Sequence, residues 1–330
     1  MWEELKQAIR LSDRRFSYTS WTRYKELRNS FYSLKKSSCY AGYISCADWD
    51  DPRLFTLPAL RRRGIPAEAV NAFVAKLGLT VAQTAIQPSM LDSVVRDYLN
   101  TTAPEQDLLS KVSSRARIMT MAVLEPLKVH IDNYLSLGLS DSLETPHFPA
   151  NPECKNTYRI AFGQTIYIER EDFRPDGEKG YRRLTNNQPV GLKHIGLVLQ
   201  VKNIQKDSDG VVDSIVATVE KLVDSNIKPK AFIHWVAEPV NCEVRLYEPL
   251  FKHKNPEDAT AVPDGFLSDC NSNTLKVLPH ALIDASVADA KIYDRFQFER
   301  TGYFCVDKDS SKQRLVFNRT VLLKEDSGKN

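Results

Sequence analysis

Three consecutive arginines, Arg61, Arg62 and Arg63, follow the short apolar run LFTLPAL and precede an amphipathic segment. A guanidinium group is planar and pairs with phosphate oxygens through two parallel N–H donors. Solubility does not require three adjacent arginines, because most polar residues suit a solvated helix surface. The cluster therefore indicates a loop-to-helix corner that grips a nucleic-acid backbone. It is equally compatible with a positive helix end, where arginines oppose the helix dipole.

A second group of candidate side chains lies on the predicted strand RFQFER. Phe296 and Phe298 alternate with Gln297, so the amide is expected on the opposite face of the strand, toward solvent or a ligand. Arg300 follows at the end of the same segment. Planar arginines, amide side chains and aromatic platforms read single-stranded RNA loops. Gln297 and Arg300 are therefore candidates for a contact with RNA, and the alternative is a barrel surface on which Arg300 pairs with a carboxylate such as Glu299.

Three further basic residues extend this prediction. Arg170 ends the alternating strand IYIER, Lys230 precedes FIHWV, and Arg245 lies in CEVRLY. Taken singly, each is more often a surface residue that pairs with a neighbouring carboxylate, such as Glu169 or Glu299. Together with the previous pair, they form a candidate RNA-binding set.

Two other clusters are predicted to be structural. Asp48, Asp50 and Asp51 would repel one another unless a cation lies between them. Arg53 is a simpler partner than a metal ion, and the Asp-Pro pair indicates a turn. His234, in the apolar segment FIHWV, has no serine or cysteine nucleophile in a recognisable arrangement, so we assign it to packing.

The composition leaves the class of partner open. Lys and Arg number 45 against 42 Asp and Glu, so the net charge of +3 is weak evidence for a polyanionic partner. The six cysteines form no CxxC pair and no histidine set has zinc spacing, so we expect reduced thiols and no metal. No apolar run is long enough to span a membrane, and residues 1–12 lack the apolar block of a secretory signal. These features predict a cytoplasmic protein.

The chain is expected to have an α+β fold with four regions. Residues 1–47 are basic and aromatic and remain unassigned, 48–140 are helical, 141–152 form a linker with three prolines, and 153–330 form two antiparallel β-barrels. Short β-branched and aromatic runs separated by polar breaks such as KDSDG indicate the strands. KNPED, within 254–258, is predicted to be a turn between the barrels.

Hydrophobic spacing predicts the helices within 48–140. Val70, Phe73, Val74 and Leu77 share one helical face that ends at Gly78. Ser89 is the expected N-cap of a second helix, with core positions at Leu91, Val94, Val95, Tyr98 and Leu99. A third helix is predicted over 121–131.

Several long sequence segments, in a fixed order along the chain, also resemble those of a known family. WDDPRLFTLPALRRRG, MAVLEPLKV, IYIEREDF, KPKAFIHWV, CEVRLYEPLFKHKNPED, FQFERTGYFCVD and VFNRTVLLKE cover most of the chain from residue 48 onward. They resemble the part of the glutaminyl-tRNA synthetases (glutamine–tRNA ligases) that follows the catalytic domain. The resemblance implies that 48–140 is the helical subdomain at the end of the catalytic region and that 153–330 binds the anticodon. It also favours RNA binding as the role of Arg61 to Arg63, and it makes Gln297 and Arg300 the best candidates for anticodon contacts.

The family implies a ligase that joins glutamine to its tRNA through an adenylate made from ATP. Its partners are then the glutamine tRNA, glutamine and ATP, and a multi-synthetase complex is a further partner that the resemblance allows. The HIGH-type histidine pair of class I synthetases is missing, since the first histidine is His130. The KMSKS-type lysine loop is missing too, since SSCYAGYISCAD, directly before Trp49, contains no Met-Ser-Lys. We therefore expect no catalytic residue and no ATP site in this chain. A glutamyl-tRNA synthetase fragment and a non-catalytic RNA-binding protein are the alternatives.

Two segments depart from the family pattern. Residues 1–47 match nothing expected, and 105–120 interrupt a junction that the family closes almost directly. Both fit the hypothesis of a mis-defined reading frame or unspliced sequence. A transcript without the 105–120 coding segment would support it, and an intact transcript that encodes this chain would end it.

Overall fold

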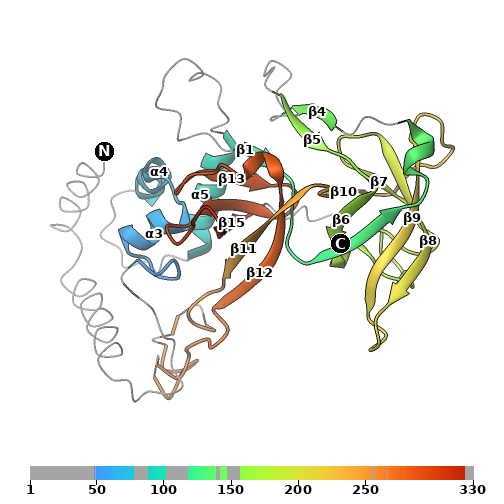
Figure 1. Cartoon of the computed structure of the whole chain (residues 1–330). Coiled ribbons are helices and arrows are strands. Elements are labelled where there is room, and N and C mark those ends of the chain that lie inside the picture. Colours follow the sequence, from blue (N-terminus) through green and yellow to red (C-terminus); the bar gives the residue numbers. More distant parts are fainter. Residues whose placement is uncertain are drawn as a thin grey trace. The chain divides into compact units, whose positions relative to one another are not determined.

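The structure is a computed structural model that describes residues 48, 50–77, 88–101, 118–138, 142–146, 157–253, 255, 256, 258–265 and 267–323. Two compact units make up the chain (Figure 1). The first unit combines Met1–Thr101 with Leu246–Lys276, and the second combines Thr102–Arg245 with Val277–Asn330. The predictions for 1–47 and 105–120 fall outside the described residues.

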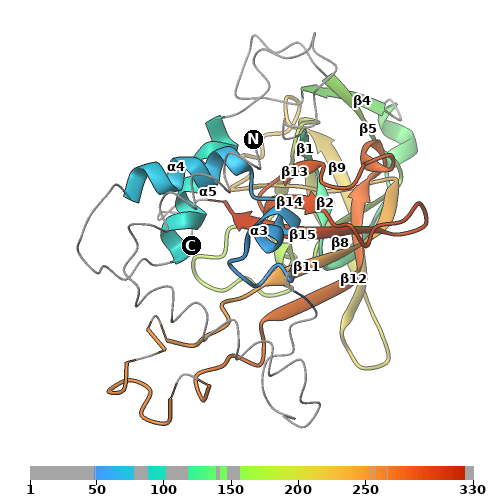
Figure 2. The same ribbon diagram turned by 90° about the vertical axis from the view of Figure 1, so that its left-hand side faces the viewer.

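The first unit contains three described helices, α3 (Leu57–Arg63), α4 (Ala67–Leu77) and α5 (Pro88–Thr101), which Figure 2 shows close together. The Thr56 side chain caps the start of α3 by accepting the Ala59 N–H at 3.2 Å. Gly64 ends it with a φ of 95°, a left-handed conformation that glycine adopts without a Cβ penalty. The triple arginine therefore forms the last turn of a short helix, directly before α4.

The helical faces agree with the sequence only in part. Leu91, Val94, Val95 and Leu99 of α5 are buried as predicted. In α4, Val70 is buried, but Val74 is 47% exposed. The prediction that Ser89 is an N-cap is wrong, because α5 begins at Pro88 and Ser89 already lies inside the helix. Proline suits the first helical position, where its missing N–H has no partner to lose.

Two barrel-like sheets dominate the rest of the described chain (Figure 1). The seven-stranded sheet has the order β1-β13-β14-β15-β11-β12-β2, and the six-stranded sheet has the order β10-β7-β8-β9-β3-β6. The strands of the first are β1 (Ile118–Thr120), β2 (Ala122–Val123), β11 (Pro239–Tyr247), β12 (Leu275–Asp284), β13 (Arg295–Phe298), β14 (Gly302–Val306) and β15 (Leu315–Leu322). Those of the second are β3 (Pro126–Ile131), β6 (Thr165–Glu169), β7 (Val190–Leu192), β8 (Leu197–Lys206), β9 (Val212–Lys221) and β10 (Phe232–Ile233). Short 3-10 turns are η1 (Tyr134–Leu137), η2 (Arg170–Asp172) and η3 (Ala285–Val287).

The expectation of purely antiparallel barrels is wrong, because both sheets are mixed. Hairpins such as β8–β9 and β13–β14 are antiparallel, whereas β1–β13, β11–β15, β3–β9 and β7–β10 are parallel. The parallel pairs join strands that are not neighbours along the chain, so no hairpin turn constrains their direction. Local sequence predicts the hairpins but not these closing contacts.

Residues 121–131 form strands rather than the predicted third helix. In β3, Leu127, Val129 and Ile131 are buried, while Lys128 between them is exposed. This period of two is the pattern of a half-buried strand, and Pro126 removes a backbone donor that a helix would need. Pairing with β6 and β9 on either side then fixes the extended conformation.

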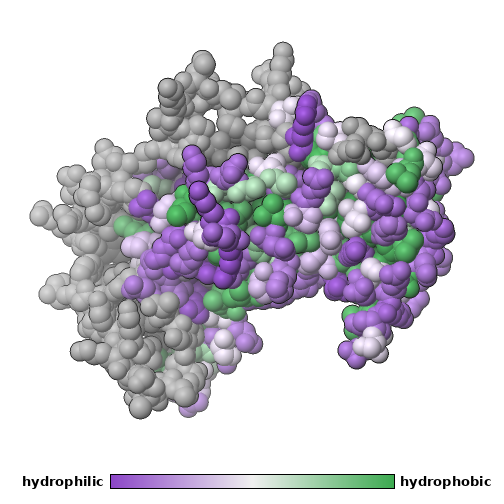
Figure 3. All heavy atoms as spheres, viewed as in Figure 1, coloured by the Kyte–Doolittle hydropathy of each residue, from purple (hydrophilic) through white to green (hydrophobic). Residues whose placement is uncertain are grey.

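Two loop assignments also change. Part of the expected linker, residues 142–146, forms β4 (Ser142–Pro146), which pairs with β5 (Thr157–Ala161). KNPED does not separate the two barrels, because it lies between β11 and β12 of one sheet. By contrast, KDSDG forms the predicted turn of the β8–β9 hairpin, with Asp207 accepting the Val211 N–H at 2.8 Å. Figure 3 shows mostly hydrophilic residues around the end of this hairpin.

Each sheet encloses its own apolar core. The six-stranded sheet buries Trp235 against Phe162, with ring centroids 5.2 Å apart in an edge-on contact. In the seven-stranded sheet, Phe298 stacks on Phe304 at 4.2 Å and meets Phe317 edge-on at 5.3 Å. Because β13 points both phenylalanines inward, Gln297 between them faces the other way, as the alternation predicts.

Candidate nucleic-acid interface

Arg300 joins the two sheets of the second unit. It lies in the turn between β13 and β14 with a φ of 63°, a left-handed conformation that few non-glycine residues adopt. Its Nη1 and Nη2 atoms donate to Oδ2 and Oδ1 of Asp172 at 2.6 Å and 2.7 Å. Asp172 ends η2 and is fully buried, while the Arg300 side chain is 24% exposed. Burial alone would lower the pKa of the guanidinium, but the hydrogen bonds and charge of Asp172 raise it above its usual value.

A histidine completes this arrangement. Arg300 Nη1 lies 3.2 Å from Nδ1 of His234, which is buried. Since a guanidinium only donates, Nδ1 must accept, and the ring proton is therefore on Nε2. Glu169 Oε1 lies 3.5 Å from Nε2, and Nε2 has no hydrogen-bond partner among the described residues. The packing role predicted for His234 thus includes a contact with a candidate RNA-binding side chain.

The loop over 174–189 links Arg300 to Lys230, which sequence reasoning placed only by its charge. Lys230 Nζ donates to Gln188 Oε1 at 2.9 Å, and Gln188 Nε2 donates to the Arg183 carbonyl at 2.6 Å. The Arg183 side chain reaches Asp172 at 3.2 Å. Two arginines therefore converge on one buried carboxylate, and these three side chains together carry a net positive charge.

The same loop carries basic groups that the sequence analysis missed. Arg174 lies 4.9 Å above the ring of Tyr181 in a cation–π contact, and burial together with the charge of Asp172 raises the pKa of Tyr181 to about 12. Lys179 and Arg182 are exposed. The run EKGYRR was a usable signal, since it interleaves cations with an aromatic ring, but it lies outside a strand or helix.

Gln297 and Arg170 are constrained by their surroundings, Gln297 by partial burial and Arg170 by two backbone carbonyls. Gln297 is partly buried, and its Oε1 is a buried acceptor without a partner in the described part of the chain. Arg170 is exposed, but its Nη1 donates to the Val212 carbonyl at 2.6 Å and its Nη2 to that of Pro126 at 3.3 Å. Arg170 begins η2, two residues before Asp172. The structure thus brings Arg170, Lys230 and Arg300 around η2 and the loop that follows it.

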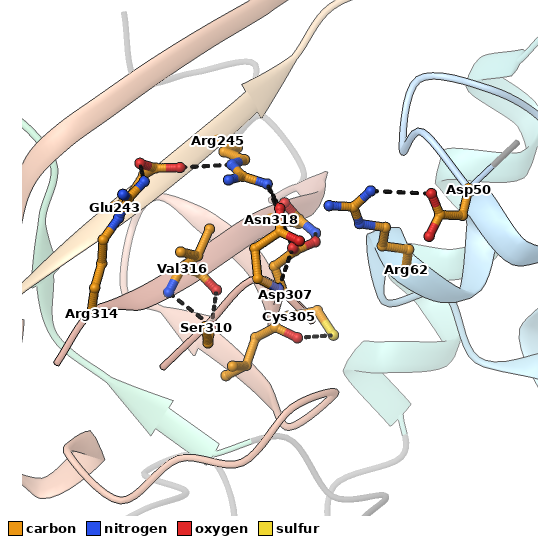
Figure 4. A network of polar contacts seen from close by, with 12 residues as sticks. Asp50, Arg62, Glu243, Arg245, Cys305, Asp307, Ser310, Arg314, Val316 and Asn318 are labelled. Atoms are coloured by element: carbon orange, nitrogen blue, oxygen red, sulfur yellow. Dashed lines mark hydrogen bonds and ion pairs between the residues drawn. The ribbon is translucent and has the colours of Figure 1, made fainter. Parts of the chain in front are cut away.

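Arg245 is part of a carboxylate network on the seven-stranded sheet (Figure 4). Its Nε donates to Glu243 at 2.7 Å and its Nη1 to Asp309 at 2.7 Å, while Asp307 lies 3.5 Å away. Burial would lower the pKa of Arg245, but these acids raise it. Glu243 also accepts from Arg314. Arg245 therefore contacts several acids, which is the surface pairing that the sequence analysis held open.

The arginines of the first unit differ from one another. Arg62 is buried and donates to Asp50 at 3.2 Å (Figure 4), and Arg63 lies 3.5 Å from Asp92. Arg61 is exposed. A separate pair confirms the structural interpretation of the acidic turn, because Arg53 binds both oxygens of Asp51 at 2.9 Å and 2.6 Å. Of the triple arginine, Arg61 is thus the most open to a ligand.

Glu299 forms a second buried ion pair beside Arg300. Its carboxylate accepts from Lys193 Nζ at 2.6 Å and pairs with His194 Nε2, both from the turn between β7 and β8. Burial would raise the pKa of the Glu299 carboxyl, but the His194 hydrogen bond and the Lys193 charge lower it. Glu299, which directly precedes Arg300, is thereby fixed to the turn between β7 and β8 of the six-stranded sheet.

Other chemistries find little support in the described residues. They contain no group of three or more His, Cys, Asp or Glu side chains arranged to hold a metal ion. None of their helices is long and apolar enough to cross a membrane. The cysteines described are free thiols, and burial raises the pKa of both Cys242 and Cys305 to about 12, which leaves them weak nucleophiles.

Comparisons with known proteins agree with the two-sheet architecture. Two family models described as class I (E and Q) tRNA synthetase, anti-codon binding domain, match residues 118–220 and 232–307. A probable glutamine–tRNA ligase of Caenorhabditis elegans is 56% identical over 286 residues, which cover 86% of this chain and 34% of that protein. The glutamine–tRNA ligase of Bos taurus is 53% identical over 86% of this chain and 34% of its own length. That of the bacterium Tolumonas auensis is 37% identical over 84% of this chain and 48% of its own. The chain thus spans about a third of the animal relatives.

Proposed function

The chain belongs to the class I (E and Q) tRNA synthetase family, and from this membership we propose that it reads the anticodon of the glutamine tRNA. The observation that carries the proposal is the position of the two family matches. They fall on strands of the two barrel-like sheets and include Arg170 and Arg300, while Lys230 lies between the two matched ranges. These groups are basic, and the Arg300 side chain remains partly exposed. Single-stranded loops are recognised by such groups, because unpaired bases offer their edges and faces.

Within this proposal the side chains have different roles. Arg300 is the main base contact, and Lys230 and Arg170 supply positive charge near it. Gln297 offers a buried amide oxygen whose hydrogen bond a base could complete. Arg61 and Arg63 contribute mainly to binding of the phosphate backbone, where charge matters more than edge geometry. Arg62 and Arg245, which pair with acids, add only positive charge to this surface.

A binding assay tests the proposal. The chain is titrated with the glutamine tRNA and with a tRNA of the same body whose anticodon is substituted, at several salt concentrations. We expect tighter binding of the cognate tRNA and an affinity that falls as salt rises. Equal affinity for both tRNAs would overturn the proposal.

Variants refine the test. Arg300→Ala should cost about 1–3 kcal/mol of binding to the cognate tRNA and reduce the preference between the two tRNAs. Arg159→Ala is the matched control, because this arginine is exposed and its one ion pair within the described residues is with Glu144, at 3.9 Å. It should leave the preference unchanged.

The activity of the whole ligase is a further part of the proposal. Its catalytic domain would activate glutamine with ATP and transfer it to the tRNA, in the cytoplasm. We expect no glutamine-dependent ATP–pyrophosphate exchange from this chain alone, because the histidine and lysine motifs of that reaction are missing from it. Robust exchange would show that an active site has been overlooked. Charging assays with glutamine and glutamate on a full-length protein would separate the two branches of the family.

A further inference from the structure

The hydrogen bonds of Arg300 use its guanidinium unevenly. Nη1 and Nη2 each donate one hydrogen bond to Asp172, whose carboxylate lies at the end of the planar group. The second proton of Nη1 faces Nδ1 of His234. Two donors are left, the Nε proton and the outer Nη2 proton, and they lie side by side on one edge of the guanidinium.

This remaining edge is reached by solvent. No described residue accepts from Nε, yet Nε is not among the buried polar atoms that lack a partner, so it lies at the surface. The 24% exposure of the side chain agrees with this. An edge with two parallel donors is the form in which arginine binds paired acceptors of a base.

Asp172 fixes the direction of that edge. The carboxylate is fully buried, and Arg183 Nη1 lies 3.2 Å from Oδ1, the oxygen that also accepts from Arg300 Nη2. The backbone around it is fixed as well, because the Asp172 carbonyl accepts the Leu184 N–H at 3.0 Å. A long side chain that would otherwise sample many rotamers is thereby held in one orientation before any ligand arrives.

We propose that Asp172 is a positioning residue for anticodon reading: it binds the end of the Arg300 guanidinium so that the Nε–Nη2 edge meets the acceptors of a base. The inference rests on the proposed function and adds to it a residue that touches no RNA. His234, with its ring proton on Nε2, accepts a hydrogen bond from the remaining Nη1–H and keeps the guanidinium from rotating.

The test is a double-variant cycle on tRNA discrimination. The affinities of cognate and anticodon-substituted tRNA are measured for the wild type, Asp172→Asn, Arg300→Ala and the double variant. An asparagine offers one acceptor and one donor, so it cannot bind both η nitrogens. Asp172→Asn should lower the ratio of the two affinities about tenfold, and it should change nothing further in the Arg300→Ala background.

Two additional variants exclude a purely structural role. Asp269→Asn removes another buried carboxylate, which pairs with His253 and takes no part in the proposed RNA contacts, so it should destabilise the fold but keep the discrimination ratio. Arg300→Lys can still pair with Asp172, but it has no second edge, so it should lose discrimination while remaining folded. It also tests the inference if Asp172→Asn does not fold.

The outcomes separate the two proposals. If the wild type shows no preference for the cognate anticodon, the proposed function fails. If the wild type discriminates but Asp172→Asn weakens both tRNAs equally, or Arg300→Lys discriminates as well as arginine, only the positioning role is overturned. Additive losses in the double variant would overturn it too.

Discussion

Replacing Glu299 by glutamine tests how far buried charge holds the second unit together. The Glu299 side chain is 2% exposed and accepts from Lys193, which is 30% exposed, and from His194, which is 16% exposed. A glutamine keeps one acceptor, but its amide N–H₂ must then face a second donor. Hydrogen bonds to charged groups contribute about 1.5–3 kcal/mol each, and water can replace part of the loss at the partly exposed Lys193. We expect a cost of about 2 kcal/mol in the free energy of unfolding.

The effect should depend on pH in a defined direction. The folded-state pKa of Glu299 lies below its ordinary value of 4.5, so the unfolded chain binds the proton more readily. The stabilisation is therefore complete above pH 4.5 and is lost as the pH falls through the lower folded value. A glutamine does not titrate, so the difference between wild type and Glu299→Gln should shrink in acid.

Urea unfolding at pH 7.5 and at a series of acidic pH values measures this difference, followed by tryptophan fluorescence, to which buried Trp235 of the second unit contributes. A loss of about 2 kcal/mol in the free energy of unfolding should lower the midpoint of thermal unfolding by roughly 4–8 °C. The matched control is Glu178→Gln, because Glu178 pairs with Arg174 at 79% and 51% exposure and should contribute less than about 0.5 kcal/mol. A difference that stays constant into acid, or a Glu299→Gln protein as stable as the control, would refute the reasoning.

Three other substitutions have expected outcomes that urea unfolding can check. Arg62→Ala should destabilise the first unit by about 1–3 kcal/mol, because it leaves Asp50 without this partner, whereas exposed Arg61 should tolerate the same change within about 0.5 kcal/mol; equal effects would contradict the burial of Arg62. Phe298→Ala should cost about 3–5 kcal/mol through the cavity left between Phe304 and Phe317, and a loss below 1 kcal/mol would show that the site collapses freely. Gly191→Ala should lower the unfolding midpoint, because the new methyl carbon would lie 2.3 Å from the Phe232 ring; an unchanged midpoint would mean that the ring moves aside without cost.

The sequence by itself determined features that depend on neighbours along the chain. Asp51 and Arg53 are two positions apart, so their pairing could be predicted from the need for a cation among the neighbouring aspartates of one turn. The alternation around Gln297 predicted its face because successive strand side chains point to opposite sides. The sequence segments that resemble the synthetase family also indicated the class of function, since the two matched anticodon-binding domains cover most of those segments in the barrel region.

Only the tertiary structure decided features that depend on distant packing. Residues 121–131 have apolar spacing that suited a helix, and their pairing with β6 and β9 made them strands. Asp172 and Arg300 are 128 positions apart, so no local pattern could pair them. A carboxylate selects its cation only once burial removes water and two sheets bring the groups within hydrogen-bonding distance. For that reason Arg300 could be predicted as a candidate from the sequence, whereas only the folded structure shows that Asp172 orients its guanidinium.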